Sequence, residues 1–112
     1  MKYIYITLLL ATMNSFGQLV KVDYADGNQK LEGFFTKAQK ANPKKIGVIV
    51  LPAWMGVDAH AKESAENLSK LGYHAFVADI YGVGNNPKNT GEAGKNAGFY
   101  KNNPAEYQKR IQ

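Results

Sequence analysis

Residues 46–52 read Ile-Gly-Val-Ile-Val-Leu-Pro, an apolar run that ends at a proline. The apolar residues are continuous rather than alternating, which is typical of a strand buried on both faces in a parallel sheet covered by helices. We expect Pro52 to end the strand, because proline has no N–H for the strand ladder. The run therefore predicts an interior strand over 46–51 in an α/β fold.

A helix and a second strand follow this run. Asp58 is placed to N-cap a helix reaching about Leu71, and Gly72 is the residue type expected just past a helix end. Apolar residues recur at helical spacing along one face of that segment: Ala61, Ala65, Leu68 and Leu71. Residues 73–80 form a second apolar stretch. The order of strand, helix and strand predicts a βαβ unit.

The segment before the βαβ unit has the pattern of a β-hairpin. Two short stretches rich in β-forming residues, 19–24 and 31–36, flank Asp26-Gly27. Asp-Gly favours a tight hairpin turn, because glycine accepts a positive φ without a Cβ clash. Residues 37–45 form a polar connection to the apolar run.

Two helices are expected after the βαβ unit. Residues 91–101 place Ala93, Ala97 and Tyr100 on one face, although two glycines weaken the helix. Asn103 and Pro104 are typical of a helix start, with Glu106 in the first turn.

The last predicted helix has made about two turns at Gln112, and its apolar residues Tyr107 and Ile111 have no predicted partner. We therefore expect the N-terminal part of a larger protein. The alternative is a complete small domain with a short terminal helix.

Residues 1–17 begin with one lysine, continue with an uncharged apolar stretch over 3–13, and end in Ser-Phe-Gly. These regions are typical of a secretory signal peptide, and the stretch is shorter than the roughly 20 residues of a spanning helix. We expect cleavage before Gln18, export of residues 18–112, and no stable membrane anchor. The alternative is a buried N-terminal strand, since the stretch is also rich in β-forming residues.

Composition excludes several classes of function. The 112 residues contain no cysteine, so they hold no disulfide, thiolate metal site or cysteine nucleophile. The formal charge is +5, but the basic residues are scattered and nucleic-acid binding is not expected. The composition does not indicate an oligomeric state.

The loop over 51–58 is the first candidate site, because ligands of open α/β sheets bind at the carboxyl ends of strands. Trp54 and Met55 could line a pocket there, with backbone N–H groups binding an oxyanion. The alternative is that both side chains form a hydrophobic plug over the end of the sheet.

Other candidate sites are weaker. Gly82-Val83-Gly84 suggests a phosphate loop, but Pro87 replaces its third glycine and no helix follows at once. We expect Asp79 to accept bonds from loop N–H groups rather than act in acid–base chemistry. The candidate nucleophiles and bases are His60, Ser64, Ser69 and His74. Neither serine lies in a Gly-x-Ser-x-Gly elbow and no third, orienting acid is evident, so no catalytic pair is predicted. Two histidines 14 residues apart without a positioned carboxylate do not predict a metal site.

Three motifs occur here in combination: Tyr24-x-Asp26-Gly27, Leu51-Pro52-Ala53-Trp54-x-Gly56, and Gly72-Tyr73 followed by Asp79-Ile80-Tyr81-Gly82. Together they resemble the N-terminal part of the dienelactone hydrolase family, a group of α/β-hydrolases. The resemblance covers about residues 22–84, with 85–112 fitting more loosely. It implies an α/β-hydrolase fold that stops before the nucleophile elbow, so that strand 46–51 keeps one edge for a strand after Gln112.

The resemblance also implies a function. A Ser or Cys nucleophile, an Asp and a His would lie beyond Gln112, so the chain as given is expected to be inactive. The family's oxyanion N–H falls on Trp54, and Met55 and Tyr81 are expected to line the substrate pocket. No cofactor or metal is implied, and the expected partner is a small ester-like substrate.

One departure from the family pattern concerns the substrate. Many members have His or Gln followed by Glu where this chain has Pro52 and Ala53, which puts the dienelactone reaction in doubt and leaves other acyl substrates open. The alternative from another class is a complete, exported, non-enzymatic module that binds a ligand with the loops around Trp54 and Tyr81.

Overall fold

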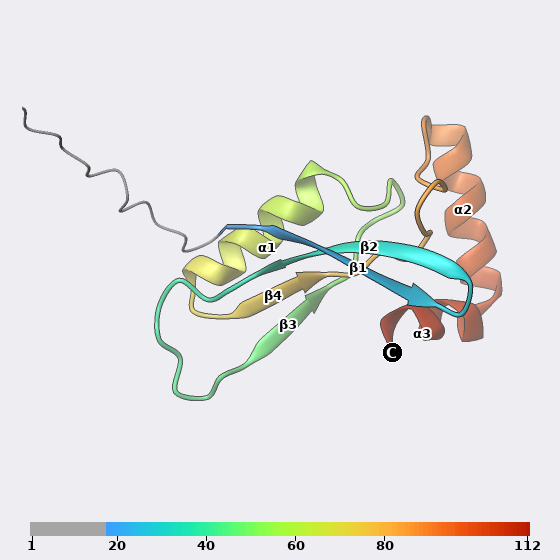
Figure 1. The fold of residues 1–112 in the computed structure, drawn as a ribbon. Coiled ribbons are helices and arrows are strands. Elements are labelled where there is room, and N and C mark those ends of the chain that lie inside the picture. The colour runs from blue at the N-terminus through green and yellow to red at the C-terminus, as the bar shows by residue number, and fades with distance from the viewer. Residues whose placement is uncertain (1–17) are drawn as a thin grey trace, which may run out of the picture.

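The computed structural model describes residues 18–112. It contains, in chain order, β1 (Val20–Asp26), β2 (Gln29–Thr36), β3 (Gly47–Val50), α1 (Ala59–Lys70), β4 (His74–Val77), α2 (Thr90–Asn102) and α3 (Pro104–Ile111). The four strands form one sheet in the order β1-β2-β4-β3 (Figure 1). The predicted hairpin, βαβ unit and two helices are therefore confirmed.

The hairpin forms at the predicted turn. β1 and β2 are antiparallel, with Asp26 opposite Gln29, and Gly27 between them has a φ of 59°. β2 then pairs antiparallel with β4, where Phe35 lies opposite Phe76. The hairpin thus adds an antiparallel edge to a sheet whose other pair, β3 and β4, is parallel.

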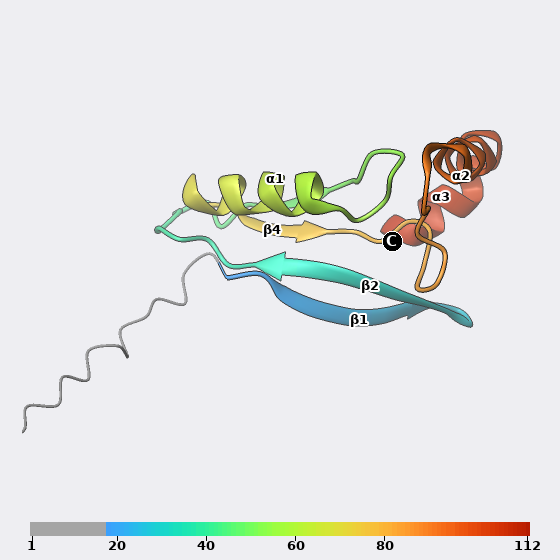
Figure 2. The same cartoon turned by 90° about the horizontal axis from the view of Figure 1, so that it is seen from above.

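α1 covers one face of the sheet, as Figure 2 shows. The Asp58 carboxylate accepts a hydrogen bond from the Ala61 N–H at 3.0 Å, which confirms the predicted N-cap. Ala61 and Ala65 pack on Ala75 and Val77 of β4. These four small side chains are almost fully buried, so they form the core between α1 and the sheet.

The predicted apolar stripe of α1 is wrong at its last position. Leu71 lies at the C-cap and is 62% exposed, because the helix ends at Lys70 and the side chain points outward. Ser69 is fully buried instead. Its hydroxyl donates to the Glu66 carbonyl at 2.8 Å and accepts from the Gln39 amide at 3.0 Å, which satisfies a polar group in the core.

β3 occupies the edge of the sheet within residues 18–112. The expectation of burial on both faces is wrong for these residues, since Ile49 is 52% exposed. Val50 packs with the core under α1, whereas no described strand lies beside the outer edge of β3. The residues of β3 are thus as apolar as those of an interior strand, although β3 lies at the edge of the sheet within residues 18–112.

β4 is shorter than the predicted strand over 73–80. It ends at Val77, although the Ala78 N–H still donates to the Val50 carbonyl at 3.1 Å. The chain then turns over 79–82 and leads to α2 and α3, which lie beyond the carboxyl ends of β3 and β4 (Figure 1). These two helices supply one wall of the candidate site.

Within residues 18–112, no helix has both the length and the apolar character needed to cross a bilayer. The predicted signal peptide over 1–17 lies outside the described residues.

Candidate functional site

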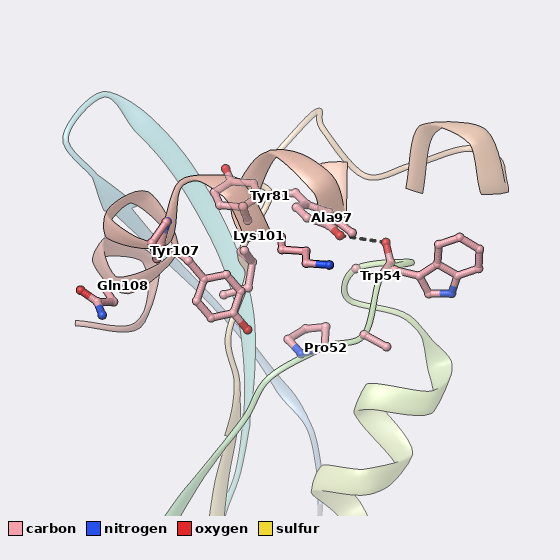
Figure 3. A pocket seen from close by; sticks show the side chains of 12 residues that line it. Pro52, Trp54, Tyr81, Ala97, Lys101, Tyr107 and Gln108 are labelled. Carbon is pink, nitrogen blue, oxygen red and sulfur yellow. Dashed lines mark hydrogen bonds between the residues drawn. The ribbon is translucent and has the colours of Figure 1, made fainter. Parts of the chain in front are cut away.

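A cavity of about 420 Å³ lies between the loop after β3 and the helices α2 and α3 (Figure 3). The loop, the end of β4 and the two helices line it: Pro52, Ala53, Trp54, Gly56, Ile80, Tyr81, Ala97, Tyr100, Lys101, Pro104, Tyr107 and Gln108. Its position at the carboxyl ends of two parallel strands is where ligands of open α/β sheets bind.

Three tyrosines form the largely apolar wall of the cavity. The ring centroids of Tyr81 and Tyr100 are 5.6 Å apart, and those of Tyr100 and Tyr107 are 6.3 Å apart. Lys101 adds one cationic side chain, which extends toward the loop that carries Trp54 (Figure 3). The arrangement suits an apolar or aromatic ligand group.

A tight turn presents Trp54 to the cavity. The Gly56 N–H donates to the Ala53 carbonyl at 3.0 Å, so Trp54 and Met55 occupy the two central positions of the turn. Gly56 has a φ of 81°, and a Cβ atom there would lie 2.9 Å from the Asn86 side-chain oxygen. The position therefore requires glycine, both for its backbone conformation and for space.

The Trp54 side chain does not fill the cavity. The residue is 48% exposed, and its indole points away from the tyrosine side chains (Figure 3). Trp54 therefore lines the cavity mainly with its backbone, and its side chain does not form the plug that was one interpretation of the sequence.

Tyr81 is hydrogen-bonded to this turn. Its hydroxyl donates to the Trp54 carbonyl at 2.9 Å, and the residue is 6% exposed. Burial raises the pKa of the Tyr81 hydroxyl above the ordinary tyrosine value, and the neighbouring Tyr107 and Tyr100 raise it further. The hydroxyl is therefore protonated and able to donate at neutral pH.

Asp79 holds the turn that carries Tyr81. One carboxylate oxygen accepts from the Gly82 N–H and the other from the Glu32 N–H, each at 2.9 Å. The Asp79 N–H in turn donates to the Tyr24 hydroxyl at 2.9 Å. The predicted bonding of Asp79 to backbone N–H groups is confirmed, and the turn over 79–82 is anchored to both strands of the hairpin.

Comparison with known proteins identifies the family. The model of the dienelactone hydrolase family matches residues 31–111. The chain belongs to the dienelactone hydrolase family. No match was found among curated proteins.

Two solved structures place this dienelactone hydrolase family chain within a larger fold. The structure named m3DLH is 26% identical, with a TM-score of 0.74, and the match covers 83% of this chain and 39% of that one. The crystal structure of a dienelactone hydrolase-like promiscuous phosphotriesterase from metagenomic libraries is 32% identical, with a TM-score of 0.72 and coverages of 83% and 38%. The chain thus spans about two fifths of either structure and matches the N-terminal part of an α/β-hydrolase fold.

Membership of the dienelactone hydrolase family relates the chain to hydrolases that act on ester-like substrates. The structure brings Trp54 and Tyr81, two of the residues predicted for the site, together in one cavity. Met55 is half-buried beside Trp54 but does not line that cavity. The roles of these three residues in catalysis or binding stay predictions.

The remaining candidate side chains lie in other places. The Ser64 hydroxyl donates to the His60 carbonyl at 3.0 Å rather than to an imidazole. His74 is half-buried, and its Nδ1 accepts from the Ala38 N–H at 3.0 Å. No group of three His, Asp or Glu side chains in the described part of the chain could hold a metal ion.

Sequence reasoning missed the helical wall of the cavity. It placed Ala97 and Tyr100 on one helical face but gave no sign that this face meets Tyr81. Lys101 and Tyr107 were likewise not predicted as site residues. The apolar and aromatic side chains on these two short helices indicate that one face of each helix is buried. They do not indicate which part of the chain that face packs against.

Proposed function

We propose that this member of the dienelactone hydrolase family carries the oxyanion-binding part of an acyl-ester hydrolase site, with a Ser or Cys nucleophile located after Gln112. The Trp54 turn at the wall of the apolar cavity supports this proposal above all. A backbone N–H held at a fixed place beside a largely apolar cavity is suited to stabilise an oxyanion.

The proposed reaction uses the Trp54 N–H at one step. The nucleophile attacks the acyl carbonyl carbon, and the carbonyl π electrons move to its oxygen. The Trp54 N–H donates to the resulting oxyanion. The oxyanion then collapses, and the proposed His, which took the proton of the nucleophile during the attack, passes that proton to the leaving alcohol. Water then attacks the acyl-enzyme and releases the acid, and its proton returns to the nucleophile through the same His.

The cavity indicates the class of substrate. Its tyrosine wall and a volume of about 420 Å³ favour an apolar or aromatic ester. Pro52 and Ala53 supply no carboxylate at the position where many family members have one, so a substrate other than a dienelactone is proposed. The matched phosphotriesterase makes a phosphotriester a useful second substrate in an assay.

The first experiment extends the coding sequence beyond the codon for Gln112 and assays the whole product with aryl acyl esters and a phosphotriester. We expect a Gly-x-(Ser or Cys)-x-Gly elbow followed by Asp and His, with ester hydrolysis by the whole product and none by residues 1–112 alone. A stop codon after Gln112, or a whole product without hydrolysis, would reject the proposal and favour the binding module.

Two substitutions at one position test the oxyanion role in that whole product. Trp54→Pro removes the N–H, and proline is well tolerated at the second position of a tight turn. Trp54→Ala keeps the N–H and removes the same indole. We expect kcat of Trp54→Pro to be about 100-fold below that of Trp54→Ala. Equal kcat values would show that this N–H does not hold the oxyanion.

We also propose that residues 1–17 direct export and are removed. Cell fractionation and N-terminal sequencing of the whole product test this. A product found outside the cytoplasm that begins at or near Gln18 is expected, whereas an intact Met1 on cytoplasmic protein would contradict it.

A further inference from the structure

Two hydrogen bonds hold the turn that carries the Trp54 N–H, one on each peptide that flanks Trp54. The peptide before Trp54 is held by the bond from the Gly56 N–H to the Ala53 carbonyl at 3.0 Å. The peptide after Trp54 is held by the bond from the Tyr81 hydroxyl to the Trp54 carbonyl at 2.9 Å. Because C=O and N–H point in opposite directions across a trans peptide, holding the Ala53 carbonyl orients the Trp54 N–H. The bond to the Trp54 carbonyl holds the next peptide, between Trp54 and Met55, and so anchors the turn that carries this N–H.

The hydrogen bond from Tyr81 is long-range in sequence, whereas the hydrogen bond from Gly56 is local. The Gly56 bond lies within the turn and moves with it, whereas Tyr81 is 27 positions away in the chain. Tyr81 thus connects the turn to the segment that follows β4.

The segment that carries Tyr81 is itself held in place by hydrogen bonds. The Gly82 N–H donates to the Asp79 carboxylate at 2.9 Å, and the Arg110 Nε donates to the Ile80 carbonyl at 2.9 Å. Tyr81 is buried against Tyr100, with the ring centroids 5.6 Å apart. A side chain held in this way can fix the position of the Trp54 turn relative to the sheet.

We propose that Tyr81 is a positioning residue, whose hydroxyl holds the Trp54 turn in the geometry that presents the Trp54 N–H to an oxyanion. This inference rests on the function proposed above. Tyr81 acts through Trp54 and takes no proton from the substrate. Its raised pKa supports the role, because only the protonated hydroxyl can donate to the carbonyl.

The first test measures the turn without any activity. Trp54 is the single tryptophan of residues 1–112. In the whole product, with any later tryptophan replaced by Phe, fluorescence anisotropy and quenching by acrylamide therefore report on this turn. Tyr81→Phe removes only the hydroxyl. We expect lower anisotropy and roughly two-fold stronger quenching in that variant, at an unchanged melting temperature within a few degrees.

Tyr73→Phe is the matched control. Tyr73 precedes β4 at the end opposite the cavity and does not line it. This variant removes one hydroxyl elsewhere and is expected to leave the Trp54 signal unchanged. If Tyr81→Phe matches wild type in both fluorescence readouts, the hydroxyl does not hold the turn and the inference is overturned.

The second test measures the consequence in the whole product. We expect Tyr81→Phe to lower kcat by about 10-fold with little change in KM, since the substrate still binds the same ring. A loosened turn with an unchanged kcat would overturn the positioning role. A wild-type product that hydrolyses no ester would instead reject the proposed function, and the fluorescence result would then show separately whether Tyr81 holds the turn.

Discussion

The Arg110 guanidinium in α3 forms an ion pair with the Asp26 carboxylate at the end of β1, although the two residues are 84 positions apart. Both side chains are largely buried, with exposed fractions of 10% and 25%. The Arg110 Nε also donates to the Ile80 carbonyl. One side chain therefore connects the last helix, the first hairpin and the turn that carries Tyr81.

This contact predicts a clear loss of stability. Arg110→Gln leaves the Asp26 carboxylate and the Ile80 carbonyl without their donor in a partly buried place, which we expect to cost about 2 kcal/mol. Lys109→Gln is the control, because the Lys109–Glu106 pair has exposed fractions of 56% and 43% and contributes about 0.5 kcal/mol or less. Urea denaturation of the two variants of the whole product measures the difference. Equal midpoints would mean that the Arg110 contacts do not stabilise the fold.

Alanine substitution should have opposite effects on stability at Gly56, in the Trp54 turn, and at Gly94, in α2. Gly56→Ala forces a side chain into a left-handed backbone and places its Cβ 2.9 Å from the Asn86 oxygen, so we expect a loss of about 2 kcal/mol. Gly94→Ala lies in α2, where an added Cβ meets nothing within 4 Å, and should gain about 0.5 kcal/mol or more. Thermal melting of both variants of the whole product checks the signs. A neutral Gly56→Ala would show that the turn adapts easily.

Alkaline pH should destabilise the chain through two tyrosines. Burial raises the pKa of Tyr24 and of Tyr81 above the ordinary value of about 10. A raised pKa in the folded state means that the unfolded chain loses these protons first. Their contribution is therefore fully present below about pH 10 and is lost as the pH rises through the folded-state values.

Unfolding free energies of the whole product, measured in urea between pH 9 and pH 11, check this prediction. A Tyr24→Phe, Tyr81→Phe double variant should show a shallower decline than wild type over that range, because only the remaining groups still titrate. The same slope in both proteins would contradict it.

The exposed edge of β3 predicts association of the isolated polypeptide 18–112. Ile46, Ile49 and Leu51 are 41%, 52% and 44% exposed, and no described strand covers the outer edge of β3. Unpaired apolar edges recruit other strands, so we expect aggregation and a melt of poor cooperativity. Light scattering at several concentrations measures this, and Ile49→Lys should reduce it. A sharp melt from a monomer would contradict this prediction.

Local signals in the sequence were sufficient for most elements of the fold. Asp26-Gly27 predicts the hairpin turn, and Asp58 and Gly72 mark the two ends of α1. These predictions succeed because turn and cap preferences depend on a few neighbouring residues. The errors fall where tertiary position decides, as at Leu71, which lies one residue past the last turn of α1, and at β4, which ends three residues early.

The site was only partly predictable. A loop after an apolar strand, together with the family motifs, was enough to single out Trp54, and the end of the next strand pointed to Tyr81. Met55 was predicted beside them because it follows Trp54 in sequence, but in the turn the two side chains do not share the cavity. Sequence spacing does not give the direction of side chains in a tight turn.

Periodicity, caps and motifs are properties of neighbouring residues, so the amino-acid sequence was enough to predict most of the secondary structure, the α/β class and the family. The tertiary structure alone decided that Tyr81 bonds to Trp54, that Asp79 joins the hairpin, and that Arg110 reaches Asp26. These contacts join residues 27, 47 and 84 positions apart. They form only when the packed sheet and helices bring those positions together, so no local pattern encodes them.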